Sequence, residues 1–195
     1  MNLKNLILKL TTIALMVFLF FGCASKIMVA TSPVTSLDNE KALVTFTFRA
    51  FLSSQGLKPR EFDIWDSEKF IGAISKGTYV QYQADPGEHI FIAIGGNTSF
   101  LKAVLAAGKE YSVDVNIYLG PPFKKQYVAF QPVKIRNLNQ LSYIHRLLKR
   151  KQVMEIIPEE YDQYVKKRIP QIQYLIKEYE NNEVKYVSLD ERDGM

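Results

Sequence analysis

The chain has 195 residues, of which 47% are hydrophobic and 23% charged, and a formal net charge of +5. This length suits one domain with a packed core, and the composition excludes a wholly disordered chain. The single cysteine, Cys23, excludes a disulfide within the chain and any multi-cysteine zinc or iron–sulfur site, and only two histidines are present. We therefore predict no metal site and no cofactor, and the small positive charge does not by itself indicate nucleic acid.

The N-terminal end is organised like a secretory signal. Lys4 and Lys9 precede an uncharged, apolar stretch that runs from Leu10 to Gly22. Such a stretch matches the apolar region of a signal peptide, about 7–15 residues long, whereas a membrane-spanning helix needs about 20 apolar residues. The alternative is an uncleaved amphiphilic anchor whose two lysines reach the membrane interface.

The stretch ends in Gly22 and Cys23, and this end resembles a bacterial lipoprotein signal. In that family a diacylglycerol is attached to the cysteine thiol, the chain is cut before the cysteine, and the new amino group is acylated. The leucine and the small residue that usually precede the glycine are replaced here by Phe20 and Phe21. The resemblance therefore depends on Gly22, Cys23 and the apolar stretch.

The resemblance implies a signal peptide over residues 1–22, lipid attachment at Cys23 and a lipidated tether over residues 23–40, in which Ile27 to Ala30 can add an edge strand. Acyl chains contribute ~0.8 kcal/mol per buried methylene, so two or three of them hold a protein on a membrane almost permanently. The protein is thus expected in the bacterial cell envelope. Ala24, in place of an aspartate, favours the outer membrane with the protein facing the periplasm, and export excludes nucleic acid as a partner.

From residue 41 to residue 136 the hydrophobic pattern has a period of two, which is typical of strands. Turn residues such as Asp66-Ser67 and Asp85-Pro86-Gly87 separate the segments. We predict seven strands, over residues 43–49, 62–66, 69–74, 78–84, 88–96, 109–119 and 126–135. The segment 88–96 is apolar on both faces and is predicted to be central, whereas Ser112, Asp114 and Asn116 are predicted to face outward. The fold class predicted is mainly β, an antiparallel seven-stranded β-sandwich, immunoglobulin-like or prealbumin-like.

Three short motifs lie in or between these strands: Ile71-Gly72, then Pro86-Gly87-Glu88-His89, then Leu105 with Gly108 and Tyr111. They resemble a family of bacterial envelope lipoproteins, domain-of-unknown-function family 2846, and the related PEGA-type domains. The resemblance covers about half of the chain and implies an antiparallel sandwich with no established catalytic residues. We interpret His89 as a strand residue satisfied by a backbone carbonyl near the turn, because a metal site needs three or four convergent ligands.

The segment 137–182 is predicted to form two helices. Asn137 or Asn139 caps the first, which runs to about Gln152. The apolar side of this helix comprises Leu138, Leu141, Ile144, Leu147 and Leu148. Pro158 opens the second helix, whose apolar stripe runs from Tyr161 to Tyr179. Pro170 lies opposite the stripe, which favours one kinked helix over two. Residues 183–195 are predicted to be a short strand or a loose tail.

Between Asp114 and Glu155 the chain has no acidic residue but eight cations. They are Lys124, Lys125, Lys134, Arg136, Arg146, Lys149, Arg150 and Lys151. On a lipid-anchored protein they predict binding to an anionic surface, at ~1 kcal/mol per cation, and a solvated face is the alternative. The helices are predicted to cover an open face or edge of the sandwich, with presentation of the apolar stripe to a partner protein as the alternative.

No catalytic residue is predicted, since the chain has neither a glycine-rich phosphate loop nor a Gly-x-Ser-x-Gly elbow. We predict a lipid-anchored cell-envelope protein that acts as a non-catalytic binding or structural module, with an envelope protein partner of unknown identity. One alternative is an envelope enzyme acting on cell-wall glycan or peptide, which needs a polar cleft formed by His89 or by two of Glu61, Asp63, Asp66 and Glu68. The other is an accessory subunit of a larger envelope complex, which needs an exposed apolar stripe on the second helix.

Overall fold

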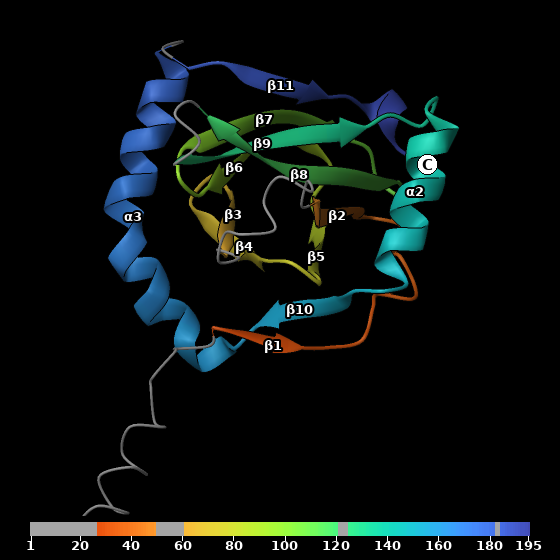
Figure 1. Ribbon diagram of the computed structural model, residues 1–195, viewed down its shortest axis with the longest axis horizontal. Helices are drawn as coiled ribbons and strands as arrows, with labels where there is room; N and C mark the ends of the chain where they lie inside the picture. Colours follow the sequence, from red (N-terminus) through yellow and green to blue (C-terminus); the bar gives the residue numbers. More distant parts are fainter. Residues whose placement is uncertain (1–26, 50–60, 121–124, 182–183) are drawn as a thin grey trace, which may run out of the picture.

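The computed structural model describes residues 27–49, 61–120, 125–181 and 184–195. Two sheets pack against each other, and the two helices lie at opposite sides of the molecule (Figure 1). The six-stranded sheet A has the order β1 (Met28–Ala30), β10 (Gln152–Ile156), β5 (Thr78–Ala84), β2 (Ala42–Arg49), β8 (Glu110–Gly120) and β9 (Lys125–Val133). The five-stranded sheet B has the order β11 (Tyr186–Leu189), β7 (Thr98–Leu105), β6 (Gly87–Ile94), β3 (Phe62–Asp66) and β4 (Lys69–Ile74).

The fold is mainly β with two C-terminal helices, as predicted, and a strand is found at each of the seven predicted positions. The number seven is wrong, because the described residues form eleven strands, β1, β7, β10 and β11 being the additional ones. The purely antiparallel arrangement is also wrong, since β2–β8, β5–β10 and β7–β11 pair in parallel. A parallel pair needs a crossover connection, and the chain between β2 and β8 crosses over through sheet B. The immunoglobulin-like or prealbumin-like description stays a prediction.

Aromatic side chains fill the space between the sheets. The period-two pattern of β2 turns Val44, Phe46 and Phe48 inward, where all three are buried. Phe46 packs against Phe91 of β6 in a T-shaped arrangement, with 5.1 Å between the ring centroids. Phe48 stacks on Phe62 of β3 with 5.6 Å between the centroids. β6 is the middle strand of sheet B, which confirms its predicted central position.

Side chains of sheet B close the long edge of sheet A. β9 is the last strand of sheet A, so part of its backbone has no neighbouring strand. The Asn97 amide accepts a hydrogen bond from the Val128 N–H and donates one to the Val128 carbonyl at 3.0 Å. The Ser99 hydroxyl accepts one from the Phe130 N–H at 3.1 Å. These contacts satisfy backbone groups that would otherwise be open to another strand.

The helix α3 (Pro158–Glu180) covers sheet B. Tyr164 packs on Phe70 of β4 with 4.8 Å between the ring centroids, and Tyr179 stacks on Phe100 of β7 at 5.5 Å. Between these contacts Ile172 is fully buried. The apolar stripe is therefore covered by the sandwich of the same chain, as the favoured interpretation predicted.

Pro170 lies inside α3 without ending it, and its side chain is exposed. This confirms one continuous helix with the proline opposite the apolar stripe. Figure 1 shows α3 bowed along its length around the side of the sandwich. An exposed proline removes one backbone donor on the solvent side, where the loss disturbs the packing least.

The shorter helix α2 (Leu138–Leu148) packs on the end of β9. Its cap is Asn137, whose side-chain oxygen accepts a hydrogen bond from the Gln140 N–H at 3.1 Å. Leu141 and Ile144 are buried together with Val133 of β9. One of the two predicted caps is thus confirmed, and the inward side of the helix is largely the predicted one.

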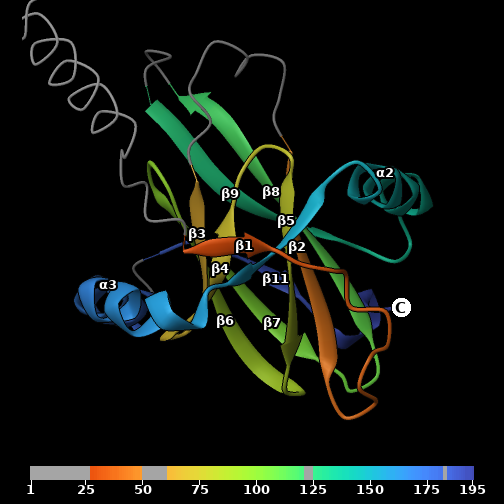
Figure 2. The ribbon, with the colours of Figure 1, turned by 90° about the horizontal axis from the view of Figure 1, so that it is seen from below.

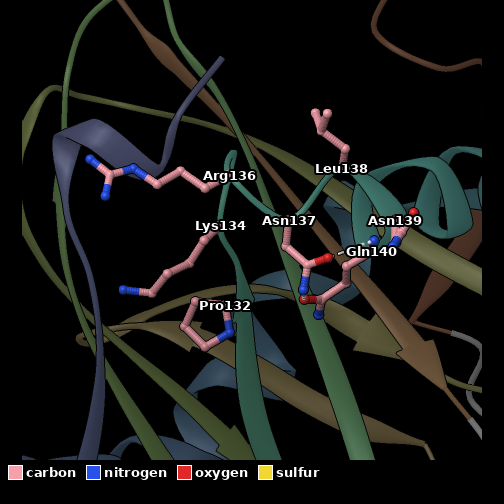
Figure 3. Close-up of a pocket in the computed structure, with 7 residues that line it drawn as sticks. All are labelled: Pro132, Lys134, Arg136, Asn137, Leu138, Asn139 and Gln140. Carbon is pink, nitrogen blue, oxygen red and sulfur yellow. Dashed lines mark hydrogen bonds between the residues drawn. The ribbon is translucent and has the colours of Figure 1, made fainter.

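Two details of this helix differ from the prediction. The helix ends at Leu148 and not near Gln152, because Gln152 begins β10 and pairs with Thr78 of β5. Leu138, predicted on the apolar side, is 71% exposed. Leu138 is the first residue of the helix and lies outside the part that packs on β9. Its side chain points away from that strand (Figure 3).

The C-terminal segment takes part in the fold. β11 pairs with β7 at the edge of sheet B, and a short 3-10 helix, η2 (Glu191–Asp193), follows. The backbone of Met195 then exchanges hydrogen bonds with that of Glu110, at 3.0 and 3.1 Å. At the other end of the described chain, β1 lies within the segment predicted to be a tether and pairs with β10.

Candidate functional site

Four of the eight predicted cations form an exposed surface around α2. Arg146, Lys149 and Arg150 lie in or just after its last turn, and Arg136 lies just before its cap. All four side chains are exposed. We call these four residues the α2 cations. Arg146 remains in solvent because the helix is amphipathic and turns its apolar side to β9.

Lys134 and Arg136 line an open depression of about 690 Å³ in front of α2 (Figure 3). Both side chains point toward the C-terminal segment. Asn137 and Gln140 instead turn toward each other, and the Asn137 amide donates a hydrogen bond of 3.1 Å to the Gln140 side-chain oxygen. The polar groups therefore do not converge on one point, and the depression is not a preformed anion cage.

The C-terminal segment supplies negative charge to this surface. The Lys134 Nζ lies 3.8 Å from the Asp193 Oδ2. Lys134 and Arg136 also line a smaller depression, of about 150 Å³, with Asp190, Arg192 and Asp193. The predicted run of cations without acidic neighbours is therefore wrong at Lys134, since acidic residues distant in the sequence fold beside it.

A second open depression, of about 330 Å³, lies at the other end of α2. Arg146 and Arg150, one helical turn apart, line it together with Tyr143 and Leu147. Guanidinium groups beside an aromatic ring can donate hydrogen bonds to phosphate or carboxylate while the ring rests on apolar atoms. This end of the helix is the part of the predicted basic surface that is best suited to an anionic layer.

Lys151, predicted to be part of that surface, is turned inward. Its Nζ donates a hydrogen bond to the Thr47 Oγ1 at 3.1 Å and another to the Phe48 carbonyl oxygen. Burial lowers the pKa of Lys151 to about 8, against the opposing effect of the negative charge of Asp114. Lys151 therefore fastens the connection between α2 and β10 to sheet A and is not one of the α2 cations.

A row of polar strand residues lies beneath Lys151. Thr47, Asp114 and Gln131 are register partners across β2, β8 and β9, and Asp114 is 0% exposed. Ser112 and Asn116, on either side of Asp114, are buried as well. These residues face away from the core, as predicted, but they are buried: Lys151 reaches Thr47 and lies near Asp114, and the Asn116 amide donates to the Gln131 side-chain oxygen.

Thr47 and Lys151 have the chemical groups of a hydroxyl–amine pair, an arrangement that serves covalent catalysis in other proteins. A nucleophile must be reached by its substrate, and Thr47 is 0% exposed. The pair therefore acts here as an internal attachment between the loop and the sheet.

His89 at the start of β6 is held by two acceptors. Its Nε2 lies 2.8 Å from the Asp85 carbonyl oxygen, which confirms the predicted backbone partner, and its Nδ1 lies 2.8 Å from the Asp66 Oδ2. Asp66, which the sequence did not reveal as a partner, raises the pKa of His89 through this hydrogen bond. Asp66 also accepts a hydrogen bond from the Tyr82 hydroxyl at 3.0 Å. The imidazolium form is favoured because both ring nitrogens can then donate.

Two of the other carboxylates considered for a glycosidase pair, Asp63 and Glu68, also have partners within the chain. The Tyr164 hydroxyl lies 2.8 Å from both oxygens of Asp63, and burial raises the pKa of Asp63. Glu68 accepts a hydrogen bond of 3.1 Å from the Gln173 amide. Both contacts attach α3 to the β3–β4 hairpin. Over the described ranges no three His, Cys, Asp or Glu side chains gather into a cluster that could hold a metal ion.

Three of the predicted site residues are not placed by these contacts. Cys23 and Lys124 lie outside the described residues, and Lys125 is the first residue of β9, where it is the register partner of Gly120. Among the helices that the structure describes, none combines the length and the apolar character needed to span a bilayer. No family model, no curated protein and no solved structure matches this chain.

Proposed function

We propose that this protein is a lipid-anchored component of the bacterial cell envelope and that it acts by binding, not by chemistry. Its anchor is a lipid on Cys23, its location is the outer membrane with the folded part facing the periplasm, and Arg146, Lys149 and Arg150 contact an anionic surface. The suggested relation to the envelope lipoproteins of domain-of-unknown-function family 2846 belongs to the same proposal.

The observation that carries the binding role is the division of α2 into two sides. Leu141 and Ile144 are buried against β9, so most of the apolar side of the helix is covered by the same chain. Arg146 in its last turn, and Lys149 and Arg150 just after it, are exposed. A fixed helix with cations outward presents charge beside open depressions and not inside an enclosed pocket, which suits an extended anionic layer better than a small molecule.

The anchor is tested by labelling growing cells with a radioactive or clickable fatty acid. We expect the label on the wild-type protein and none on the Cys23→Ser variant, which should also keep the mass of the uncleaved chain. Labelling that persists in Cys23→Ser would contradict acylation at this residue. The Ala24→Ser variant is a control that leaves the thiol in place and should be labelled like the wild type.

The binding surface is tested with residues 27–195 and liposomes that contain phosphatidylglycerol. We expect salt-sensitive binding, weakened about tenfold or more by Lys149→Glu combined with Arg150→Glu, since each cation near an anionic membrane contributes ~1 kcal/mol. The matched control is Lys166→Glu with Lys167→Glu, two exposed lysines of α3. Equal binding to neutral liposomes, or equal losses in the two double variants, would contradict the assignment to α2.

A further inference from the structure

We infer that the protein sits on the membrane in a defined orientation: the edge formed by β1 and β10, together with the C-terminal end of α2, faces the lipid headgroups. This inference rests on the proposed anchor at Cys23 and adds which side of the molecule meets the bilayer. The occupant of the surface is an anionic lipid layer.

The chain between the anchor and the fold is short. Ile27 is buried, and its carbonyl accepts a hydrogen bond from the Ile157 N–H at 2.8 Å. β1 begins at the next residue, Met28. Only residues 24–26 separate Cys23 from Ile27, and at 3.3–3.6 Å per residue this distance is at most about 15 Å. A cysteine acylated at the bilayer surface therefore keeps the start of β1 close to the headgroups.

Cations lie along this same edge. The chain leaves α2 through Lys149 and Arg150 and enters β10 at Gln152, whose side chain donates a hydrogen bond of 3.0 Å to the carbonyl of Thr31, just after β1. β1, which has three residues, spans about 10 Å between the anchored end and Thr31. Lys149 and Arg150 therefore lie a short distance along the edge from the anchored end, and Arg146 is one turn of α2 further.

Lys76 adds a cation that the sequence window did not include. It is exposed in the turn between β4 and β5, next to Gly77, whose carbonyl accepts a hydrogen bond of 2.9 Å from the Gln152 N–H. Lys76 thus lies beside the start of β10, near Lys149 and Arg150. Residues from two distant parts of the chain contribute positive charge to one edge.

The figures show the same arrangement. In Figure 1 β1 and β10 form one edge of the molecule and the last turn of α2 leads into it, whereas β11 lies at the opposite edge. Figure 2 views the molecule from the β1 side, with α3 on one flank and α2 on the other. Val29, 43% exposed on β1, adds apolar surface to this edge.

The acidic residues determine the tilt. Glu159 and Glu160, in the first turn of α3, and Glu155 of β10 are exposed near the anchored end of β1. Anionic headgroups repel this end and attract the α2 end. The molecule should therefore lean onto Lys76, Arg146, Lys149 and Arg150, with the first turn of α3 raised.

The orientation is tested on the full-length acylated protein in vesicles of phosphatidylglycerol and phosphatidylethanolamine. Because Cys23 is the only cysteine and is blocked by lipid, one introduced cysteine is the only free thiol. We would introduce Val29→Cys, Lys149→Cys or Ser188→Cys, attach a nitroxide, and measure its relaxation by a nickel chelate on a lipid headgroup. We expect several-fold stronger relaxation at positions 29 and 149 than at position 188 on β11.

Charge reversal supplies the second measurement. Arg150→Glu should reduce the relaxation at position 149, and Lys185→Glu, an exposed lysine next to β11, should leave it unchanged. The mass of the N-terminal peptide is determined in the same samples. Acylated protein with equal relaxation at positions 149 and 188 would overturn the orientation and leave the proposed function standing, whereas an unmodified Cys23 would overturn both.

Discussion

At the scale of single residues, burial has given one of the predicted surface cations a different role. Lys151 was expected to face an anionic layer, and its ammonium group instead donates to Thr47 and to the Phe48 carbonyl over a sheet face that contains Asp114. Nothing in the local sequence separates Lys151 from Lys149, two residues earlier. The difference arises because the chain turns into β10 at this point, which directs one lysine inward and leaves the other in solvent.

The lowered pKa of Lys151 has a consequence for stability that can be measured. Below pH ~8 the Lys151 amine is protonated in both the folded and the unfolded chain. Between that pH and the pKa of an unfolded lysine, near 10.4, the amine is protonated only in the unfolded chain. The free energy of unfolding should therefore rise with pH across this range, by at most about 3 kcal/mol. Urea unfolding should show this rise in the wild type and in Lys149→Met, and not in Lys151→Met. Parallel pH profiles of the three proteins would contradict a lowered pKa.

At the scale of elements, α3 is attached to the β3–β4 hairpin by apolar packing and by polar contacts from Tyr164, Arg168 and Gln173. Tyr164→Phe removes the hydroxyl that lies 2.8 Å from both oxygens of Asp63, which is 7% exposed. A buried carboxylate that loses its donor should cost about 1–3 kcal/mol of unfolding free energy. Tyr174→Phe, at a position of the same helix that is 61% exposed, should change it by less than ~0.5 kcal/mol. Equal effects in thermal unfolding would show that the contact does not stabilise the helix.

The elements that the sequence predicted are those with a strong local signal. The alternation in β2 and β8 and the apolar stripe of α3 extend over enough residues to be recognised, and both are present. The Asn137 cap is recognised by its residue type just before a helical pattern, and it is present too. β7 and β10 were missed. β10 has five residues and its sequence, Gln152–Ile156, follows a helical pattern directly. Its strand conformation comes from pairing with β5 and β1, which no local pattern contains.

The same distinction applies to the candidate site. The exposed character of Arg146, Lys149 and Arg150 follows from helix periodicity, so the sequence predicts it. The pairing of Lys134 with Asp193, the inward turn of Lys151 and the position of Lys76 beside β10 depend on contacts between distant segments. Charge counted within a window of sequence therefore overestimates one part of this surface and omits another.

At the scale of the whole molecule, the two strands that flank α3 in the sequence, β10 and β11, determine how the protein should unfold. Sequence pattern divides it into a β-sandwich over residues 41–136 and a helical segment over residues 137–182. In the structure β10 pairs with β5, and β11 with β7. The sheets are completed by strands that lie on either side of α3 in the sequence, so sandwich and helices should form one cooperative unit.

Ile172→Ala tests this cooperativity. Ile172 is fully buried in α3 and packs with the main core, so its truncation should cost about 2–5 kcal/mol. If the chain is one cooperative unit, Ile172→Ala lowers the temperature of a single unfolding transition. Far-ultraviolet and near-ultraviolet circular dichroism should then report the same temperature. The exposed neighbour Gln171→Ala should leave that temperature nearly unchanged. If the helical segment folded separately from the sandwich, the Ile172→Ala curve would show two transitions. Only the helix would then lose stability, because the aromatic core formed by Phe46, Phe91 and Phe130 would keep its stability.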